Sequence, residues 1–299
     1  MTTADVAYLG VPFDGGCSFR PGARFGPGAI RQASRNLRTQ WHPDYQLAPY
    51  NDHQAADAGD VSCNPFCIGD ALTVIQETAD GILATGAKAL VCLGGDHTIA
   101  LPLLRTVAKL HGPVALLHID AHLDTWDTYF GAPHTHGTPF RRAFEEGLYL
   151  QDCSVHVGIR GPLYSKLDLA NDAALGFLVV HCDEFTTKGI PDIVARIKAR
   201  IGDRPCYLSI DIDSLDPSAA PGTGTPEMAG MSSREMLLLL RGLQGMQFVG
   251  ADIVEVSPSY DHAEITSLAA ATIAYEQTML LLKSVKAMQR QLPAAAAQA

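Results

Sequence analysis

Val114-Ala115-Leu116-Leu117 is an apolar run that leads, through His118-Ile119, into Asp120-Ala121-His122-Leu123-Asp124. A short apolar run of this kind is typical of a buried β-strand. In an extended backbone, residues i, i+2 and i+4 project from the same face. We therefore expect Asp120, His122 and Asp124 to point together, where a buried strand reaches the edge of its sheet.

Two other predicted strands end in similar polar groups. Tyr207-Leu208-Ser209-Ile210 leads into Asp211-Ile212-Asp213, and Ala89–Leu93 leads into Gly94-Gly95-Asp96-His97. A hydrophobic core does not accommodate so many charged groups without a cation. N-caps or turns would explain one such cluster, but three together favour a site for two metal ions. Oxygen ligands with a minority of imidazoles suit Mn²⁺, and the predicted ligands are His97, Asp120, His122, Asp124, Asp211 and Asp213.

Other polar residues near these clusters are predicted to support the site, contact the substrate or transfer a proton rather than bind metal. We interpret Asp96 and Asp216 as supporting residues, because Asp96 breaks the alternation set by His97 and Asp216 precedes Pro217, a common turn arrangement. Asp127 is a weaker candidate for contact with a substrate, with an exposed loop acid as the alternative. Either His134 or His136 is placed to move a proton to a leaving amine, and His136 is preferred.

Glu255 lies inside the apolar run Ile253-Val254-Glu255-Val256. A buried glutamate usually has a partner. A guanidinium would fit, because its paired N–H groups match a carboxylate. The alternative is an internal ion pair with an arginine.

Apolar runs alternate with helix-like segments along the chain, which indicates an α/β fold with a mainly parallel sheet covered by helices on both faces. About eight strands fit either an open sheet or a closed barrel. The expected strands are 6–9, 58–61, 87–93, 114–119, 154–159, 176–180, 206–210 and 248–256. The expected helices are 28–36, 69–85, 99–110, 138–146, 190–200, 232–243 and 267–288. We find no linker, and expect residues 1–299 to form a single domain.

Composition excludes some classes of protein. The net charge of −10 argues against nucleic acid and anionic membranes as partners. No apolar run has the length of a membrane span, so we expect no membrane partner. The seven cysteines are odd in number and several lie in apolar runs, which indicates reduced thiols in a cytoplasmic protein.

Further stretches, taken with the metal-ligand clusters, carry a resemblance to a known family. They are Arg20-Pro21-Gly22-Ala23-Arg24-Phe25-Gly26-Pro27, Ser209–Pro217, Ala220-Pro221-Gly222-Thr223-Gly224-Thr225-Pro226 and Val254-Glu255-Val256-Ser257-Pro258. The chain resembles the ureohydrolase family of arginases and agmatinases over nearly its whole length.

The resemblance implies a three-layer α/β/α sandwich with a parallel, eight-stranded sheet, and two Mn²⁺ ions. It implies that one ion takes His97, Asp120, Asp124 and Asp211, and that the other takes His122, Asp120, Asp211 and Asp213. It also implies that His136 moves a proton, that Glu255 pairs with the substrate guanidinium, and that Asp124 helps to move the proton of the attacking water. The expected reaction is hydrolysis of a guanidino compound to an amine and urea, by a homo-oligomer, often a trimer or hexamer.

The loop Thr125–His136 lacks the Asn- and Ser-rich pattern with which arginases hold arginine, and it resembles agmatinases. Agmatine, hydrolysed to putrescine in polyamine biosynthesis, is therefore the expected substrate. The alternatives are guanidinobutyrate, guanidinopropionate or a proclavaminate precursor. Asp127 would suit a distal amine, and Arg20 or Arg24 would suit a distal carboxylate. Two-metal phosphoesterases also use Asp and His clusters, but Glu255 is unfavourable for a phosphate.

Overall fold

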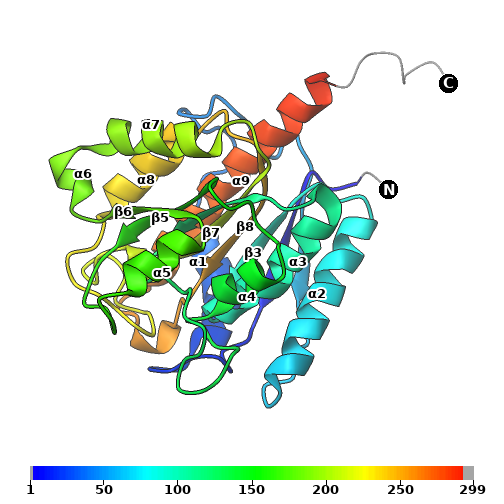
Figure 1. Ribbon diagram of the computed structural model, residues 1–299. Helices are drawn as coiled ribbons and strands as arrows, with labels where there is room; N and C mark the ends of the chain where they lie inside the picture. Colours follow the sequence, from blue (N-terminus) through cyan, green and yellow to red (C-terminus); the bar gives the residue numbers. More distant parts are fainter. Residues whose placement is uncertain (1–2, 292–299) are drawn as a thin grey trace.

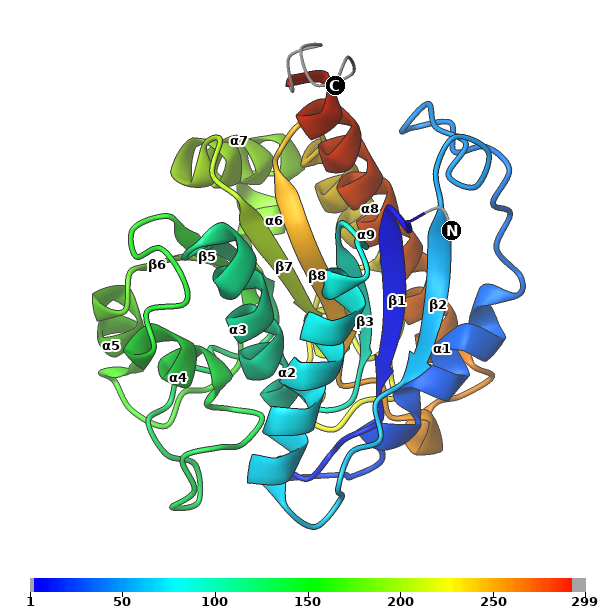
Figure 2. The ribbon, with the colours of Figure 1, turned by 90° about the vertical axis from the view of Figure 1, so that its right-hand side faces the viewer.

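The computed structural model describes residues 3–291, and describes side chains up to Val285. Its centre is a parallel sheet of eight strands in the order β2-β1-β3-β8-β7-β4-β5-β6 (Figures 1 and 2). In chain order the strands are β1 (Val6–Val11), β2 (Ala55–Asp60), β3 (Leu90–Gly94), β4 (Ala115–Ile119), β5 (Ser154–Ile159), β6 (Phe177–His181), β7 (Cys206–Asp211) and β8 (Phe248–Val254). The sheet is open, so the predicted α/β sheet is confirmed and a closed barrel is excluded.

Helices cover both faces of the sheet, which confirms the three-layer sandwich. One face carries α1 (Gly26–Ser34), α7 (Ile190–Ile201), α8 (Ser233–Gly242) and α9 (Ile265–Gln291). The other carries α2 (Ile68–Ala84), α3 (Ala100–His111) and α4 (Pro139–Glu145). Two short helices, α5 (Asp168–Ala174) and α6 (Glu184–Thr187), flank β6, and short 3-10 turns lie at Ala23–Phe25, His97–Ile99, Ile212–Ser214 and Pro258–Tyr260.

Side-chain alternation along β4 supplies both hydrophobic cores. Ala115, Leu117 and Ile119 pack with α7, α8 and α9, whereas Leu116 packs with α3 and α4. Because both faces are covered, the central strands are buried along their whole length. This is why they are visible in the sequence as continuous apolar runs.

The edge strand and the shortest helices differ from the sequence prediction. β2 spans Ala55–Asp60 rather than the expected 58–61, because it is an exposed edge strand without the apolar run that marks its neighbours. The helices α5 and α6 were not expected, since seven and four residues are too few for a helical period of apolar residues to stand out.

The start of α8 agrees with its sequence signal. Ser232 accepts a hydrogen bond from the backbone N–H of Glu235, and the Glu235 carboxylate accepts one from the backbone N–H of Ser232. This reciprocal capping box satisfies two N–H groups that a helix end leaves free.

The expectation about membrane-length segments needs a correction. Ile265–Val285 in α9 is long and apolar enough, by length and composition, to cross a membrane. However, most of that stretch is buried inside the protein, where it packs on β8 and α1. Its apolar residues are therefore accounted for by the hydrophobic core, as in a buried helix that is apolar all round.

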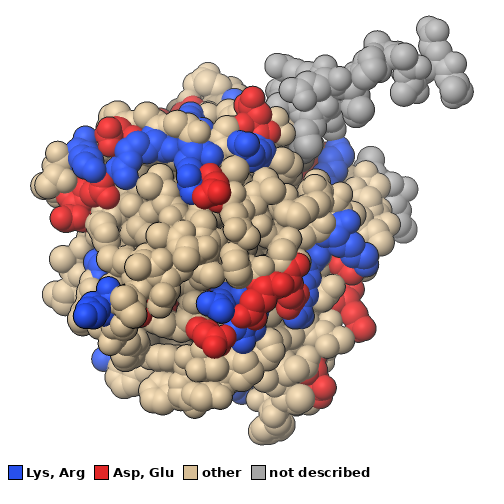
Figure 3. Space-filling view, in the orientation of Figure 1, with Lys and Arg blue, Asp and Glu red and all other residues tan. Residues whose placement is uncertain are grey.

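The surface and the thiols add two observations. On the face seen in Figure 3, acidic and basic side chains lie beside one another in several groups, and ion pairs such as Lys109–Asp80 and Arg105–Glu146 connect neighbouring helices. All seven cysteines lie within the described residues and are free, in keeping with the reduced thiols that we expect.

Candidate active site

The predicted ligands converge at the carboxyl edge of four neighbouring strands, β3, β8, β7 and β4. In Figure 2 the strands run downward, so this edge lies at the bottom of the sheet. The ends are level, because Leu93 of β3 pairs with Ile253 of β8, and Ile119 of β4 pairs with Ile210 of β7. Strand order and register thus bring together residues from distant parts of the chain.

His97 is fully buried against three carboxylates. Its Nδ1 lies 3.2 Å from Asp120 Oδ2, 3.0 Å from Asp124 Oδ2 and 3.4 Å from Asp211 Oδ2. On the far side of the ring, Nε2 lies 2.8 Å from Ser209 Oγ, which donates to Asp252 Oδ1 at 2.8 Å. The Ser209 hydroxyl donates its hydrogen to Asp252, so it accepts a hydrogen bond from His97 Nε2–H. In a neutral His97 ring, Nδ1 then carries a lone pair, and this lone pair faces the three carboxylates.

His122 forms a second group beside the first. Its Nδ1 lies 3.1 Å from Asp213 Oδ2 and 3.4 Å from Asp120 Oδ1. Asp120 therefore presents one oxygen to each imidazole, as expected of a ligand shared by two ions. Asp211, predicted to be shared as well, contacts the His97 group and accepts a hydrogen bond from the backbone N–H of Asp213.

These contacts pass a direct test of fit to metal ions. Nδ1 of His97 is buried and makes no hydrogen bond, although three carboxylate oxygens surround it. Burial, together with Asp213 and Asp120, raises the pKa of Asp211 well above its ordinary value. Burial also raises the pKa of Asp213 to about 6, with His122 opposing the shift and Asp120 adding to it. Cations between these oxygens and nitrogens would give His97 Nδ1 a partner and would stabilise the charged form of both carboxylates.

The ligands converge through bends in the backbone, which corrects one step of the sequence argument. β4 ends at Ile119, so Asp120, His122 and Asp124 do not lie on one extended strand. Asp124 instead adopts a left-handed conformation with φ of 55°, and Glu255 has φ of 63°. Such values are strained for residues other than glycine and cluster at functional sites.

Asp96 and Asp216 bind backbone groups, as their supporting roles predict. Asp96 accepts hydrogen bonds from the backbone N–H groups of Gly16 and Thr98. Asp216 accepts from the backbone N–H groups of Ser218 and Gly230. Asp96 thereby holds the loop after β1 against the metal-ligand clusters.

Glu255 and His136 lie together next to the metal-ligand clusters. His136 Nδ1 is 3.4 Å from Glu255 Oε1, which also accepts a hydrogen bond from the backbone N–H of His97. On its other side, His136 Nε2 is 2.7 Å from Ser18 Oγ. Burial opposes a charge on His136, but Glu255, Asp124 and Asp96 prevail and raise its pKa to about 9. Among residues 3–285, no arginine or lysine is within ion-pair distance of Glu255, so the alternative of an internal arginine pair is not supported.

A cavity of about 640 Å³ opens onto these residues. His122, Asp124, Asp211 and His136 line its floor. Its walls come from four loops, which follow β1, β4, β5 and β7, and the lining side chains there are Phe19, Arg20, Trp126, Tyr129, Leu163, Tyr164 and Glu227. The rings of Trp126 and Tyr129 stack with centroids 5.5 Å apart, and the Tyr129 and Tyr164 hydroxyls lie 2.6 Å apart. His134 is not among the lining residues, which favours His136 as predicted.

The loop acid Asp127 lies elsewhere, so its predicted contact with substrate is not supported. Its side chain is 67% exposed, and its carboxylate pairs with Arg142 at 2.5 Å. Glu227 lines the cavity instead, with Oε1 4.0 Å from His122 Nε2. Sequence reasoning missed Glu227, although it lies in a loop, 218–230, that stands out for its glycines and prolines. Arg24 pairs with Asp14, whereas Arg20 lines the cavity.

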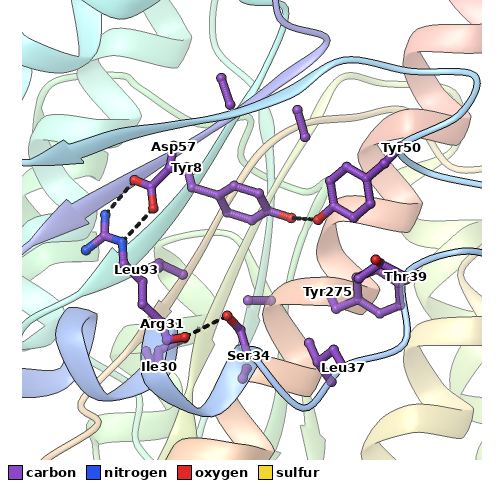
Figure 4. Close-up of a pocket in the computed structure, with 14 residues that line it drawn as sticks. Tyr8, Ile30, Arg31, Ser34, Leu37, Thr39, Tyr50, Asp57, Leu93 and Tyr275 are labelled. Atoms are coloured by element: carbon purple, nitrogen blue, oxygen red, sulfur yellow. Dashed lines mark hydrogen bonds and ion pairs between the residues drawn. The ribbon is translucent and has the colours of Figure 1, made fainter.

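A second cavity, of about 400 Å³, lies beside the edge strand β2, on the face of the sheet that α1 and α9 cover (Figure 4). Arg31 forms ion pairs with Asp57 and Asp60, and the hydroxyls of Tyr8 and Tyr50 lie 3.4 Å apart. None of the predicted site residues lines it. It therefore lacks the combination of acids and imidazoles found at the carboxyl edge.

Comparison with known proteins agrees with this geometry. Residues 4–280 match the model of the arginase family. The chain is 44% identical to putative agmatinase 1 of Schizosaccharomyces pombe, over 94% of this chain and 78% of that protein. It is 43% identical to the guanidinobutyrase of Pseudomonas aeruginosa, over 94% and 88%.

Solved structures give the same result. The structure of proclavaminate amidinohydrolase from Streptomyces clavuligerus superposes with a TM-score of 0.89 at 41% identity, covering 96% of this chain and 94% of that one. Family, fold and metal-capable residues therefore agree. The chain belongs to the arginase family and is an amidinohydrolase, an enzyme that hydrolyses a C–N bond of guanidino compounds.

Proposed function

We propose that this enzyme depends on two Mn²⁺ ions and hydrolyses agmatine to putrescine and urea. The observation that carries a guanidinium substrate is Glu255, a buried carboxylate that faces the metal-ligand clusters without an arginine or lysine partner among the residues described. A guanidinium would supply two parallel N–H donors to such a carboxylate.

His97, Asp120, Asp124 and Asp211 would hold one ion, and His122, Asp213 and the shared aspartates Asp120 and Asp211 the other. When bound, a pair of such ions lowers the pKa of water and so supplies a hydroxide nucleophile at neutral pH. In our proposal the protein's own residues do the rest. Glu255 orients the guanidinium carbon, Asp124 accepts a hydrogen bond from the attacking water, and His136 transfers a proton to the departing amine.

The distal end of the substrate meets two charges of opposite sign. Glu227 lines the cavity and would attract the ammonium group of agmatine. Arg20 also lines it and, among the described residues, forms no ion pair, although it stacks on Phe19 and Tyr260 with distances of 5.3 and 5.4 Å to the ring centroids. Arg20 is the observation that supports the second candidate substrate class, guanidino acids such as guanidinobutyrate.

The test is a panel assay of purified, manganese-loaded protein for urea release. Agmatine, guanidinobutyrate, guanidinopropionate and arginine are compared by kcat/KM, with agmatine expected to rank first. If a guanidino acid ranked first, agmatine would be the wrong substrate, but the assignment as an amidinohydrolase would still hold. Phosphate release from phosphoesters without urea from any guanidine would contradict the reaction itself.

Replacing Glu227 by glutamine separates the two substrate classes. We expect the KM for agmatine to rise about 5-fold, because a partly exposed ion pair contributes roughly 1 kcal/mol. The KM for guanidinobutyrate is expected to stay the same or fall. Arg20→Gln is the matched variant with the opposite expectation, and steady-state kinetics on both substrates measure the difference. An unchanged agmatine KM in Glu227→Gln would show that Glu227 does not contact the ammonium.

Two further expectations stay predictions. The family resemblance predicts a homo-oligomer, a trimer or hexamer, which light scattering on the purified protein would measure. The cysteine content predicts a cytoplasmic enzyme, and the net charge predicts no nucleic-acid or membrane partner.

A further inference from the structure

A chain of buried polar side chains leads from Asp120 away from the cavity. His118 Nε2 lies 2.7 Å from Asp120 Oδ2, and His118 Nδ1 lies 2.7 Å from His156 Nδ1. His156 Nε2 lies 3.1 Å from Asp172 Oδ1, which also accepts a hydrogen bond of 2.9 Å from Thr125 Oγ1. These hydrogen-bonded side chains thus connect Asp120, a predicted metal ligand on the loop after β4, to β5 and α5.

Apolar side chains enclose both imidazoles. His118, His156 and Asp172 are each 0% exposed. The ring of Phe140 lies 4.4 Å from that of His118, and the ring of Phe177 stacks on His156 at 3.8 Å. A buried polar group that loses its partner costs about 1–3 kcal/mol, because water cannot replace the lost hydrogen bond. The hydrogen bonds between these buried side chains therefore fix the orientation of each imidazole ring.

The direction of the hydrogen bonds follows from Asp120. Its carboxylate accepts, so His118 Nε2 carries a hydrogen, and in a neutral ring Nδ1 then accepts from His156 Nδ1–H. On the far side of His156, Nε2 meets Asp172 Oδ1. The contacts on both sides of the His118 ring therefore specify which of its nitrogens faces Asp120.

We propose that His118 is a positioning residue, which holds Asp120 so that one carboxylate oxygen faces each of the two metal-ion positions. His156 and Asp172 keep the His118 ring in the orientation that this requires. The inference rests on the metal site of the proposed function. It does not depend on which guanidino compound is the substrate. Residues that support metal ligands in this way typically change metal affinity about 10- to 100-fold when replaced.

The test compares two amides at position 118 in the full-length, metal-stripped chain. A glutamine amide reaches about as far as Nε2 of histidine, whereas an asparagine amide reaches only as far as Nδ1. We expect His118→Gln to retain Mn²⁺ affinity within about 3-fold and His118→Asn to lose about 10- to 100-fold. Titration with Mn²⁺ alone, followed by calorimetry and by electron paramagnetic resonance of the two bound Mn²⁺ ions, measures the affinity of each variant. Thermal unfolding without metal shows whether each variant is folded.

A second pair of variants, at position 156, tests the same proposal even if the substitutions at position 118 prevent folding. His156→Asn retains a group opposite His118, and His156→Gln retains only the group opposite Asp172. We expect the asparagine variant to bind Mn²⁺ more tightly than the glutamine variant. Equal, unaltered affinity in all four variants would overturn the positioning role. If the unaltered chain bound no Mn²⁺, the proposed metal dependence would fail first, and this inference with it.

Discussion

Asp120→Asn is expected to lower kcat/KM by about 10³-fold or more and to prevent tight binding of both Mn²⁺ ions. Asp120 is fully buried and presents one oxygen to the His97 group and the other to the His122 group. An amide cannot offer two anionic oxygens, so both positions lose a ligand. Metal ions contribute several kcal/mol to such reactions, and each 1.36 kcal/mol corresponds to a factor of ten in rate.

Asp127→Asn is the matched control, since it removes an acid from the same loop region. Asp127 is exposed and pairs with Arg142, so we expect kcat/KM and Mn²⁺ stoichiometry to stay within about 2-fold of the unaltered enzyme, as for most surface substitutions. Atomic absorption and urea release measure the two quantities. An Asp120→Asn enzyme that retained two tightly bound ions would disprove the shared-ligand assignment. A large loss in Asp127→Asn would restore its predicted contact with the substrate.

Glu255→Gln is expected to lower kcat/KM by about 10²- to 10³-fold while leaving two Mn²⁺ ions bound. The substitution keeps the shape of the side chain and an oxygen that can accept from the backbone N–H of His97. It removes the negative charge that would pair with the substrate guanidinium. Loss of the charge on one partner of a buried pair costs about 2–5 kcal/mol, or roughly 30- to 5,000-fold, and the expected loss lies within that range.

Mn²⁺ titration and steady-state kinetics on the same preparation separate the two possible roles of Glu255. Loss of activity with unchanged Mn²⁺ affinity would support the guanidinium contact. Loss of Mn²⁺ binding would show that Glu255 acts by supporting His97. Nearly unchanged activity would contradict the proposal that this carboxylate recognises the substrate.

The sequence predicted the fold and most of the candidate site through local signals. Strands buried on both faces require continuous apolar runs, so β3, β4 and β7 were visible, and so were the polar residues that follow them. It failed where the local signal is weak. The exposed edge strand β2 was misplaced, and α9 was not recognised as long enough to span a membrane.

By itself, the sequence determined the residue types at the strand ends, and from these the prediction of a metal site. Only the tertiary structure decided which distant side chains meet. It placed Glu227 and Arg20 at the cavity, removed Asp127 from it, and joined His118 to His156 behind Asp120. The physical reason is that strand order, loop bends and the left-handed backbone at Asp124 depend on packing between segments far apart in the chain, and such contacts leave no periodic pattern in the sequence.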